Sequence, residues 1–187
     1  MNRNFIFVFF LLATLSMINA IPLQKRESKF LPCPVDPPPT PLTVSMTPDP
    51  PVSGKDVSFT ITAKLDKDVD SKTIFGIGFA DASGPLAQPT ISPACDGEGE
   101  PKCPIKAGTE FTLKPTVQAP DNLPTTYGIV VIIGEPTDDP KVPLDAYGCA
   151  YTTIGGDPTA EAVYPIAEAV YPIAGSVTEA PDAYPTI

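Results

Sequence analysis

The chain has 187 residues, and its 26 prolines are about three times the usual share of roughly 5%. It has no histidine, and 22 acidic side chains against 12 basic ones give it a net charge of −10. These values exclude imidazole as a catalytic base or metal ligand, and they argue against nucleic acid as a partner, because binding it requires Lys and Arg to neutralise phosphates.

Residues 1–20 have the pattern of a secretory signal peptide. Arg3 supplies the positive start, an apolar run extends from Phe5 to Leu15, and the small residue Ala20 offers a cleavage site. The apolar run is too short to span a bilayer, which takes roughly 20 residues. We therefore expect a protein of the secretory pathway, either secreted from the cell or delivered to the vacuolar lumen.

The segment 21–29 follows as a linker or a pro-segment. It contains the dibasic pair Lys25-Arg26. This pair either marks the removal of a short pro-segment or carries two solvated charges, and the sequence leaves both interpretations open.

Alternation of apolar and polar residues predicts strands from residue 42 onward, and no segment has a helical period. The expected strands cover 42–47, 57–65, 73–80, 86–91 (a short edge piece), 110–117, 127–133 and 144–153. Residues 127–133 are nearly all apolar, so we expect this strand to be central and covered on both faces. The pattern predicts an all-β fold, an immunoglobulin-like antiparallel β-sandwich of about seven strands.

The alternating strands place one set of apolar side chains where the two sheets would face each other. The set consists of Phe59, Ile61, Phe75, Ile77, Phe79, Phe111, Leu113, Tyr127, Ile129, Val131 and Ile133. These residues either fill an ordinary core or line a cavity between the sheets. Composition alone does not separate the two alternatives.

Four cysteines stand at positions 33, 95, 103 and 149, and four cysteines allow three disulfide pairings. Cys95 and Cys103 flank a loop with enough turn residues to fold back on itself. Cys33 and Cys149 would then join the start of the folded region to its end. Zinc is the competing interpretation, but the spacing lacks the paired cysteines of zinc sites, so we expect no metal.

Residues 154–187 differ in character from the rest. The sequence Ala160–Ile166 is repeated without change as residues 167–173, and a proline in each copy prevents a continuous helix. The segment contains five acidic residues and no basic one. We expect a disordered acidic tail with a Tyr-Pro repeat, to which the sequence assigns no function.

The sequence contains no recognisable catalytic constellation. Asp66–Asp70 imitates the start of a calcium-binding loop, but Ser71 stands where that loop needs glycine and Ile77 where it needs a bidentate Glu. Paired carboxylates such as Asp138-Asp139 lie in proline-rich connections, where acidic side chains are usually just solvated. We therefore expect neither an enzyme nor a bound cofactor.

A group of short motifs, taken in their order, resembles the ML lipid-recognition domain over residues 30–153. The motifs are Pro51–Gly54, Pro93–Cys95, Lys102–Ile105, Gly108–Phe111 and Leu123–Tyr127. Within this family the sequence is most similar to fungal phosphatidylglycerol/phosphatidylinositol transfer proteins and to the soluble Niemann–Pick type C cholesterol carrier.

The resemblance implies a sandwich whose sheets separate to hold one lipid. It implies the pairs Cys33–Cys149 and Cys95–Cys103, and a cavity mouth near the loop at 122–124. Leu123 is the expected gate, with Pro124 beside it and Phe79 and Val117 nearby. Tyr127 and Lys106 are the expected contacts for a headgroup.

The function that follows is a monomeric carrier of a sterol or a phospholipid between membranes. Its partners would be the lipid and, transiently, a membrane surface, with no nucleic acid. The alternative is an extracellular β-sandwich interaction module with a solid core, which binds a cell-wall or host partner through its loops or tail.

Overall fold

The computed structural model of the chain describes residues 27–97, 100–139 and 142–156. The expected signal peptide (1–20), the dibasic pair and the repeats of the acidic tail lie outside these residues. Within them every regular element is a β-strand, which confirms the all-β class. The described residues include no helix of sufficient length and hydrophobicity to span a bilayer.

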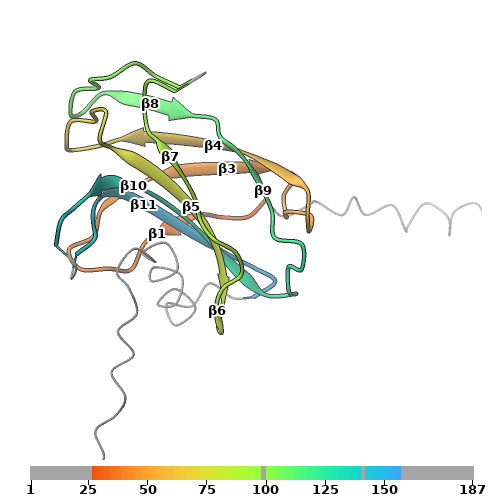
Figure 1. Cartoon of the computed structure of the whole chain (residues 1–187). Helices are drawn as coiled ribbons and strands as arrows, with labels where there is room; N and C mark the ends of the chain where they lie inside the picture. The colour runs from red at the N-terminus through yellow and green to blue at the C-terminus, as the bar shows by residue number, and fades with distance from the viewer. Residues whose placement is uncertain (1–26, 98–99, 140–141, 157–187) are drawn as a thin grey trace, which may run out of the picture.

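Two sheets pack face to face as a sandwich (Figure 1). The larger sheet contains β1 (Leu31–Pro32), β2 (Thr40–Pro41), β5 (Ile74–Asp81), β6 (Gly84–Pro85), β7 (Thr90–Pro93), β10 (Tyr127–Pro136) and β11 (Leu144–Ile154). The smaller sheet contains β3 (Thr43–Thr47), β4 (Asp56–Lys64), β8 (Glu110–Leu113) and β9 (Thr116–Gln118). Seven of these strands have four or more residues, in agreement with the expected number.

The order of strands in the larger sheet is β1-β11-β10-β5-β6, with β2 beside β11 and β7 beside β5. In the smaller sheet it is β3-β4-β8, with β9 also beside β4. All pairs are antiparallel except β2 with β11, which is parallel. The fold is therefore the antiparallel sandwich that the sequence predicts.

The alternating segments form strands with one buried and one exposed face. In β4 the side chains of Val57, Phe59, Ile61 and Ala63 are buried, while most of the intervening polar residues are exposed. β10 lies between β5 and β11, and its residues from Tyr127 to Gly134 are all buried. Burial on both faces explains its unbroken apolar sequence, and the prediction of a central strand is confirmed.

Two expected strands have different bounds in the structure. The short strand expected at 86–91 begins later in the chain and forms β7. Leu86 does not belong to it, because its N–H donates to the carbonyl of Phe79 (2.8 Å) and closes the β5–β6 hairpin. The strand expected at 110–117 is interrupted between β8 and β9. Pro115 has no N–H to donate at this point, and its carbonyl accepts a bond from Phe59 N (2.8 Å) instead.

The two edges of the sandwich differ. At one edge the chain passes directly from β2 to β3 through Leu42, so the two sheets are covalently joined there. At the opposite edge β6 and β7 belong to the larger sheet and β8 and β9 to the smaller one, and no ladder between described residues connects them. We call this second side the open edge, and the candidate site lies on it.

Two disulfides connect the parts of the sandwich. Cys33, directly after β1, is bonded to Cys149 in β11, and Cys95 is bonded to Cys103 in the connection from β7 to β8. This is the pairing that the family resemblance implies. The first bond closes a sequence separation of 116 residues and the second one of 8.

Candidate functional site

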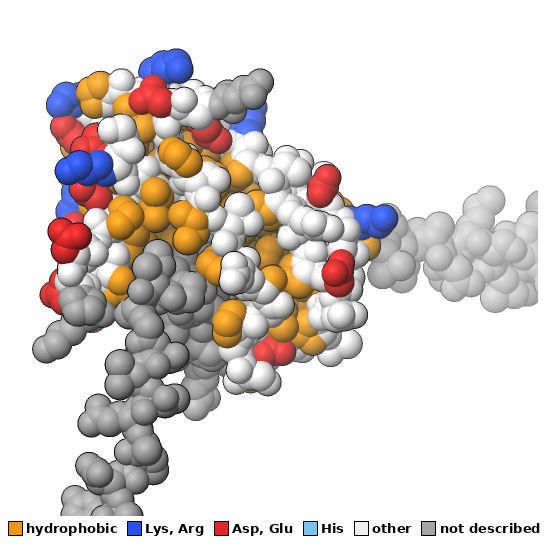
Figure 2. Space-filling view, in the orientation of Figure 1, with side chains coloured by type: hydrophobic (Ala, Val, Ile, Leu, Met, Phe, Trp, Pro, Cys, Tyr) orange, Lys and Arg blue, Asp and Glu red, His pale blue; other side chains and the backbone are white. Residues whose placement is uncertain are grey.

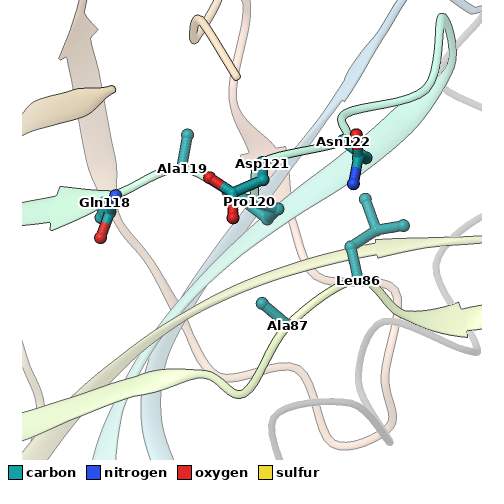
Figure 3. Close-up of a pocket in the computed structure, with 7 residues that line it drawn as sticks. All are labelled: Leu86, Ala87, Gln118, Ala119, Pro120, Asp121 and Asn122. Carbon is teal, nitrogen blue, oxygen red and sulfur yellow. The ribbon is translucent and has the colours of Figure 1, made fainter. Parts of the chain in front are cut away.

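A pocket of about 370 Å³ lies at the open edge, where the β6–β7 connection faces the β9–β10 connection (Figure 3). Its lining residues are Leu86, Ala87, Gln118, Ala119, Pro120, Asp121 and Asn122. The pocket therefore has one wall from each sheet, with apolar side chains next to an amide, a carboxylate and a second amide.

The wall from the larger sheet is formed by Leu86 and Ala87. The Leu86 side chain is partly buried and packs against the main core cluster, while Ala87 is exposed. The hydrogen bond from Leu86 to Phe79 holds this wall against β5. The wall is thus attached to the backbone of Phe79.

The opposite wall is held by the connection from β3 to β4. Ala119 N donates to Lys55 O (2.9 Å), Gly54 N donates to Pro120 O (3.1 Å), and Leu123 N donates to Ser53 Oγ (3.2 Å). Gly54 has φ 67°, and a Cβ there would lie 2.9 Å from Asp121 Oδ1. The positive φ favours glycine, and any Cβ here would also displace the Asp121 carboxylate, which accounts for the glycine of the motif Pro51–Gly54.

The structure brings together the residues expected to line a cavity. Twelve of them belong to one buried cluster between the sheets: Phe59, Ile61, Phe75, Ile77, Phe79, Phe111, Leu113, Val117, Tyr127, Ile129, Val131 and Ile133. Leu123 is partly buried against this cluster, and Pro124 is also partly buried. That these residues line a lipid cavity remains a prediction.

The expected gate Leu123 and its expected neighbour Val117 both adjoin the pocket along the chain. Val117 precedes the lining residue Gln118, and Leu123 follows the lining residue Asn122. Sequence reasoning missed the wall at Leu86 and Ala87. The prolines at 85 and 89, which flank this wall, were the available signal that a regular edge strand does not form there.

Tyr127 lies at the same end of the sandwich, beside Phe79. Their ring centroids are 6.5 Å apart at an interplanar angle of 35°. Burial raises the pKa of Tyr127 to about 12, and the negative charge of Asp49 contributes to the same shift. The phenol therefore stays uncharged at physiological pH and keeps its proton for hydrogen bonding.

Lys106 lies at the other end of the sandwich. The pocket adjoins Lys55 at the start of β4, whereas the loop of Lys106 is bonded to Leu65, just after the end of β4. Lys106 Nζ is 2.7 Å from Asp68 Oδ2, and this contact raises the pKa of Lys106 and lowers that of Asp68. Lys106 is therefore not part of this pocket, and its contact with a headgroup remains a prediction.

The cysteines do not offer a thiolate site for a metal. Cys95 and Cys103 lie near Asp96 in an arrangement with metal-ligand spacing, but their sulfurs are bonded to each other. All four cysteines are disulfide-bonded. The zinc interpretation therefore lacks its ligands.

The sequence was compared with models of known protein families. A family model described as ML domain matches residues 27–141, which is more than half of the chain. The chain belongs to the ML domain family. This confirms the resemblance drawn from the sequence, and no curated protein sequence matches the chain.

Solved structures similar to this ML domain include chicken MD-1 complexed with lipid IVa and a Niemann-Pick type C2 protein from Japanese carpenter ant. The first is 14% identical, covers 67% of this chain and 86% of the other, and has a TM-score of 0.40. The second is 14% identical, covers 69% and 92%, and has a TM-score of 0.43.

Proposed function

We propose that this ML domain binds one lipid between its two sheets and carries it between membranes, without catalysis. The observation that carries the proposal is the pocket at the open edge, directly outside the buried apolar cluster. Membership of the ML domain family supports it, and so does lipid IVa in the chicken MD-1 structure as an example of a lipid ligand.

Lipid binding follows from the same burial that stabilises the fold. A pocket of about 370 Å³ falls within the usual range for small-molecule sites, roughly 300 to 1,000 Å³. Each methylene moved from water into an apolar interior yields about 0.8 kcal/mol. A lipid longer than the pocket would enter by widening the open edge, because no ladder between described residues has to break there.

The rim of the pocket supplies polar groups for a headgroup. Gln118 and Asn122 offer amide donors and acceptors, while Asp121 offers only a carboxylate. Close to Asp121 a hydroxyl donor is favoured over a phosphate, because two negative charges repel. A sterol hydroxyl satisfies this condition, and so does a phospholipid if a hydroxyl of its headgroup, and not its phosphate, contacts Asp121.

The open edge also suits a brief contact with a membrane. Figure 2 shows hydrophobic side chains across the middle of the face, with charged side chains toward its margins. Near the pocket, Val52 is a large apolar side chain with 51% exposure. Contact through such a surface would be weak, since the net charge of −10 does not favour anionic lipids.

Secretion and a monomeric state complete the proposal. Disulfides persist in oxidising compartments, so the two bonds favour an extracellular or vacuolar location. In this account residues 1–20 are the signal peptide, 21–29 a pro-segment or linker, 30–153 the lipid-binding domain, and 154–187 an acidic tail.

An interaction module with a solid core is the second candidate. It is favoured by the interior positions themselves, since side chains such as Phe59, Leu113 and Ile129 have no more than 1% exposure. A filled core and a closed, unliganded cavity both produce such values. Lipid transfer separates the two functions.

The experiment is transfer from donor to acceptor vesicles, run with a fluorescent sterol and with a fluorescent phospholipid. A carrier raises the transfer rate in proportion to its concentration, and the lipid class that responds defines the substrate. A rate equal to that without protein, for both lipids, would refute the carrier function and leave the interaction module.

A further inference from the structure

The larger sheet has a second apolar cluster on its outer face, which points away from the smaller sheet. In β10 the side chains of Val130 and Ile132 belong to this cluster, whereas the alternate residues from Ile129 to Ile133 belong to the main cluster between the sheets. Its buried members are Cys33, Ala80, Val130, Ile132, Leu144, Cys149 and Tyr151, with Leu31, Ile74 and Ala146 partly buried against them. None of these side chains is charged, although the outer face of an antiparallel sheet is commonly polar and solvated.

This outer face is covered, yet the described residues supply no second layer for it. Val130, Ile132 and Tyr151 are 2%, 4% and 5% exposed. Every member of the cluster lies in a strand of the larger sheet, except Cys33, which directly follows β1. Strands of one sheet lie side by side and do not cover one another's faces. The connection after Cys33 is exposed over residues 34–38, and its apolar side chain Val35 is not a member of the cluster.

The C-terminal segment of the chain starts beside this face. β11 ends at Ile154, and Gly155 has φ 74°, in the left-handed region that favours glycine, so the chain turns at this point. Residues 157–187 follow directly. At the other end of the described chain, Ser28 is bonded to Asp49 in the connection between β3 and β4 of the smaller sheet. The C-terminal segment, and not the N-terminal one, is therefore placed to reach the outer face of the larger sheet.

The two repeats in this segment have the composition that such a face requires. Residues 160–166 and 167–173 each contain one charged residue, Glu161 or Glu168, among alanine, valine, tyrosine, proline and isoleucine. Chains that remain solvated usually have low hydrophobicity. In an extended proline-rich conformation, equivalent residues of the two repeats would lie about 22 Å apart. The eleven residues of β11 span about 34 Å, so both repeats fit along one face.

We propose that residues 160–173 bind the outer face of the larger sheet and form its second layer. The apolar side chains of the repeats pack on Val130, Ile132 and Tyr151, while the one carboxylate of each repeat remains in water. An extended proline-rich segment needs no hydrogen-bonded ladder for this, because its backbone groups stay solvated. In this account the repeats are bound, and not disordered as their composition predicts. The inference does not depend on lipid binding, which concerns the opposite face of the sheet.

The first test places a single tryptophan in the repeats of the full chain, which has no tryptophan of its own. Tyr164→Trp and Tyr171→Trp keep an aromatic side chain at equivalent positions, and Ser176→Trp, just after the repeats, is the matched control. The repeats are tethered to the sheet, so we expect them to be bound most of the time, with an acrylamide quenching constant roughly fivefold lower than that of the control. Their emission should also lie at shorter wavelength. Equal quenching of all three variants would overturn the proposal.

The second test identifies the surface that the repeats bind. In the Tyr164→Trp chain, Val130→Thr together with Ile132→Thr makes the outer face polar and keeps the β-branched side chains that favour a strand. Ala146→Lys introduces a charge at a partly buried position of the same face. In either variant, folded as judged by near-ultraviolet circular dichroism, quenching should rise to the level of the control. Protection that persists in a folded variant would place the repeats elsewhere and overturn the proposal.

The same fluorescence measurement, repeated over a range of protein concentrations, tests whether the repeats bind their own chain. Binding within one chain predicts quenching that is independent of concentration and a monomer mass by light scattering. Protection that appears only at high concentration, together with a dimer mass, would assign the outer face to a second copy of the chain and overturn the proposal.

Discussion

Filling the pocket without disturbing the core is the sharpest way to test its role. Ala87 lines the pocket but is exposed, so its side chain can be enlarged at small cost to folding. In the Ala87→Trp variant the indole should occupy the space between the two walls. We expect this variant to fold normally and to bind lipid much more weakly.

The expected size of the effect follows from the buried area that the lipid loses. An indole in the pocket would displace about three methylenes of a bound chain, each of which contributes about 0.8 kcal/mol. The loss of about 2.4 kcal/mol corresponds to roughly 50-fold weaker binding, since 1.4 kcal/mol is a factor of ten. A tryptophan placed on the surface outside the pocket would change the affinity by far less.

The assay is a titration of the protein with a fluorescent sterol and with a fluorescent phospholipid. The matched control is Ala107→Trp, because Ala107 is an exposed alanine in the loop next to Lys106, at the other end of the sandwich. Near-ultraviolet circular dichroism and urea unfolding establish that both variants are folded. A dissociation constant for Ala87→Trp equal to that of the control would refute the assignment of this pocket as the lipid entrance.

Three further predictions concern the interior, the disulfides and the response to pH. The Val131→Trp variant places an indole between the sheets, where overpacking costs about 1–3 kcal/mol; with a lipid cavity there, the protein stays folded and loses uptake, whereas unfolding of the variant at 25 °C would indicate a solid core. Replacing Cys33 by Ser should lower the free energy of unfolding by about 5 kcal/mol and replacing Cys95 by Ser by about 2.5, because the first bond closes the longer loop; the reverse order in urea unfolding would contradict the chain-entropy account. Since the pKa of Tyr127 is raised to about 12, the unfolded chain loses this proton first, so the free energy of unfolding should fall as pH rises from 10 to 12. The Tyr127→Phe variant should lose part of that dependence, and an unchanged pH profile would argue against a buried phenol.

The sequence was most informative where burial alternates. Val57, Phe59 and Ile61 identify β4 because every second residue faces the other sheet. The apolar run of β10 identifies a central strand because both of its faces are covered. These signals depend only on the local chain, so they could be read without the structure.

The features that the sequence did not reveal depend on contacts between distant segments. The pocket is lined by Leu86, which follows β6, and by Asn122, which follows β9 of the other sheet. No local sequence pattern predicts that these two segments lie next to each other. Likewise, the sequence does not show that Lys106 is bonded to Asp68 and lies at the end of the sandwich opposite the pocket. β1 and β2 were missed because proline-rich segments have no alternation, and only their pairing with β11 makes them strands.

The central claim is that this ML domain holds a lipid between its sheets. Native mass spectrometry of the secreted, full chain tests it most directly, because the intact complex and the released ligand are weighed in the same experiment. The account predicts one lipid per protein monomer, displaced in the Ala87→Trp variant and retained in Ala107→Trp. A folded protein that carries no lipid and takes up none from sterol-containing or phospholipid vesicles would contradict it.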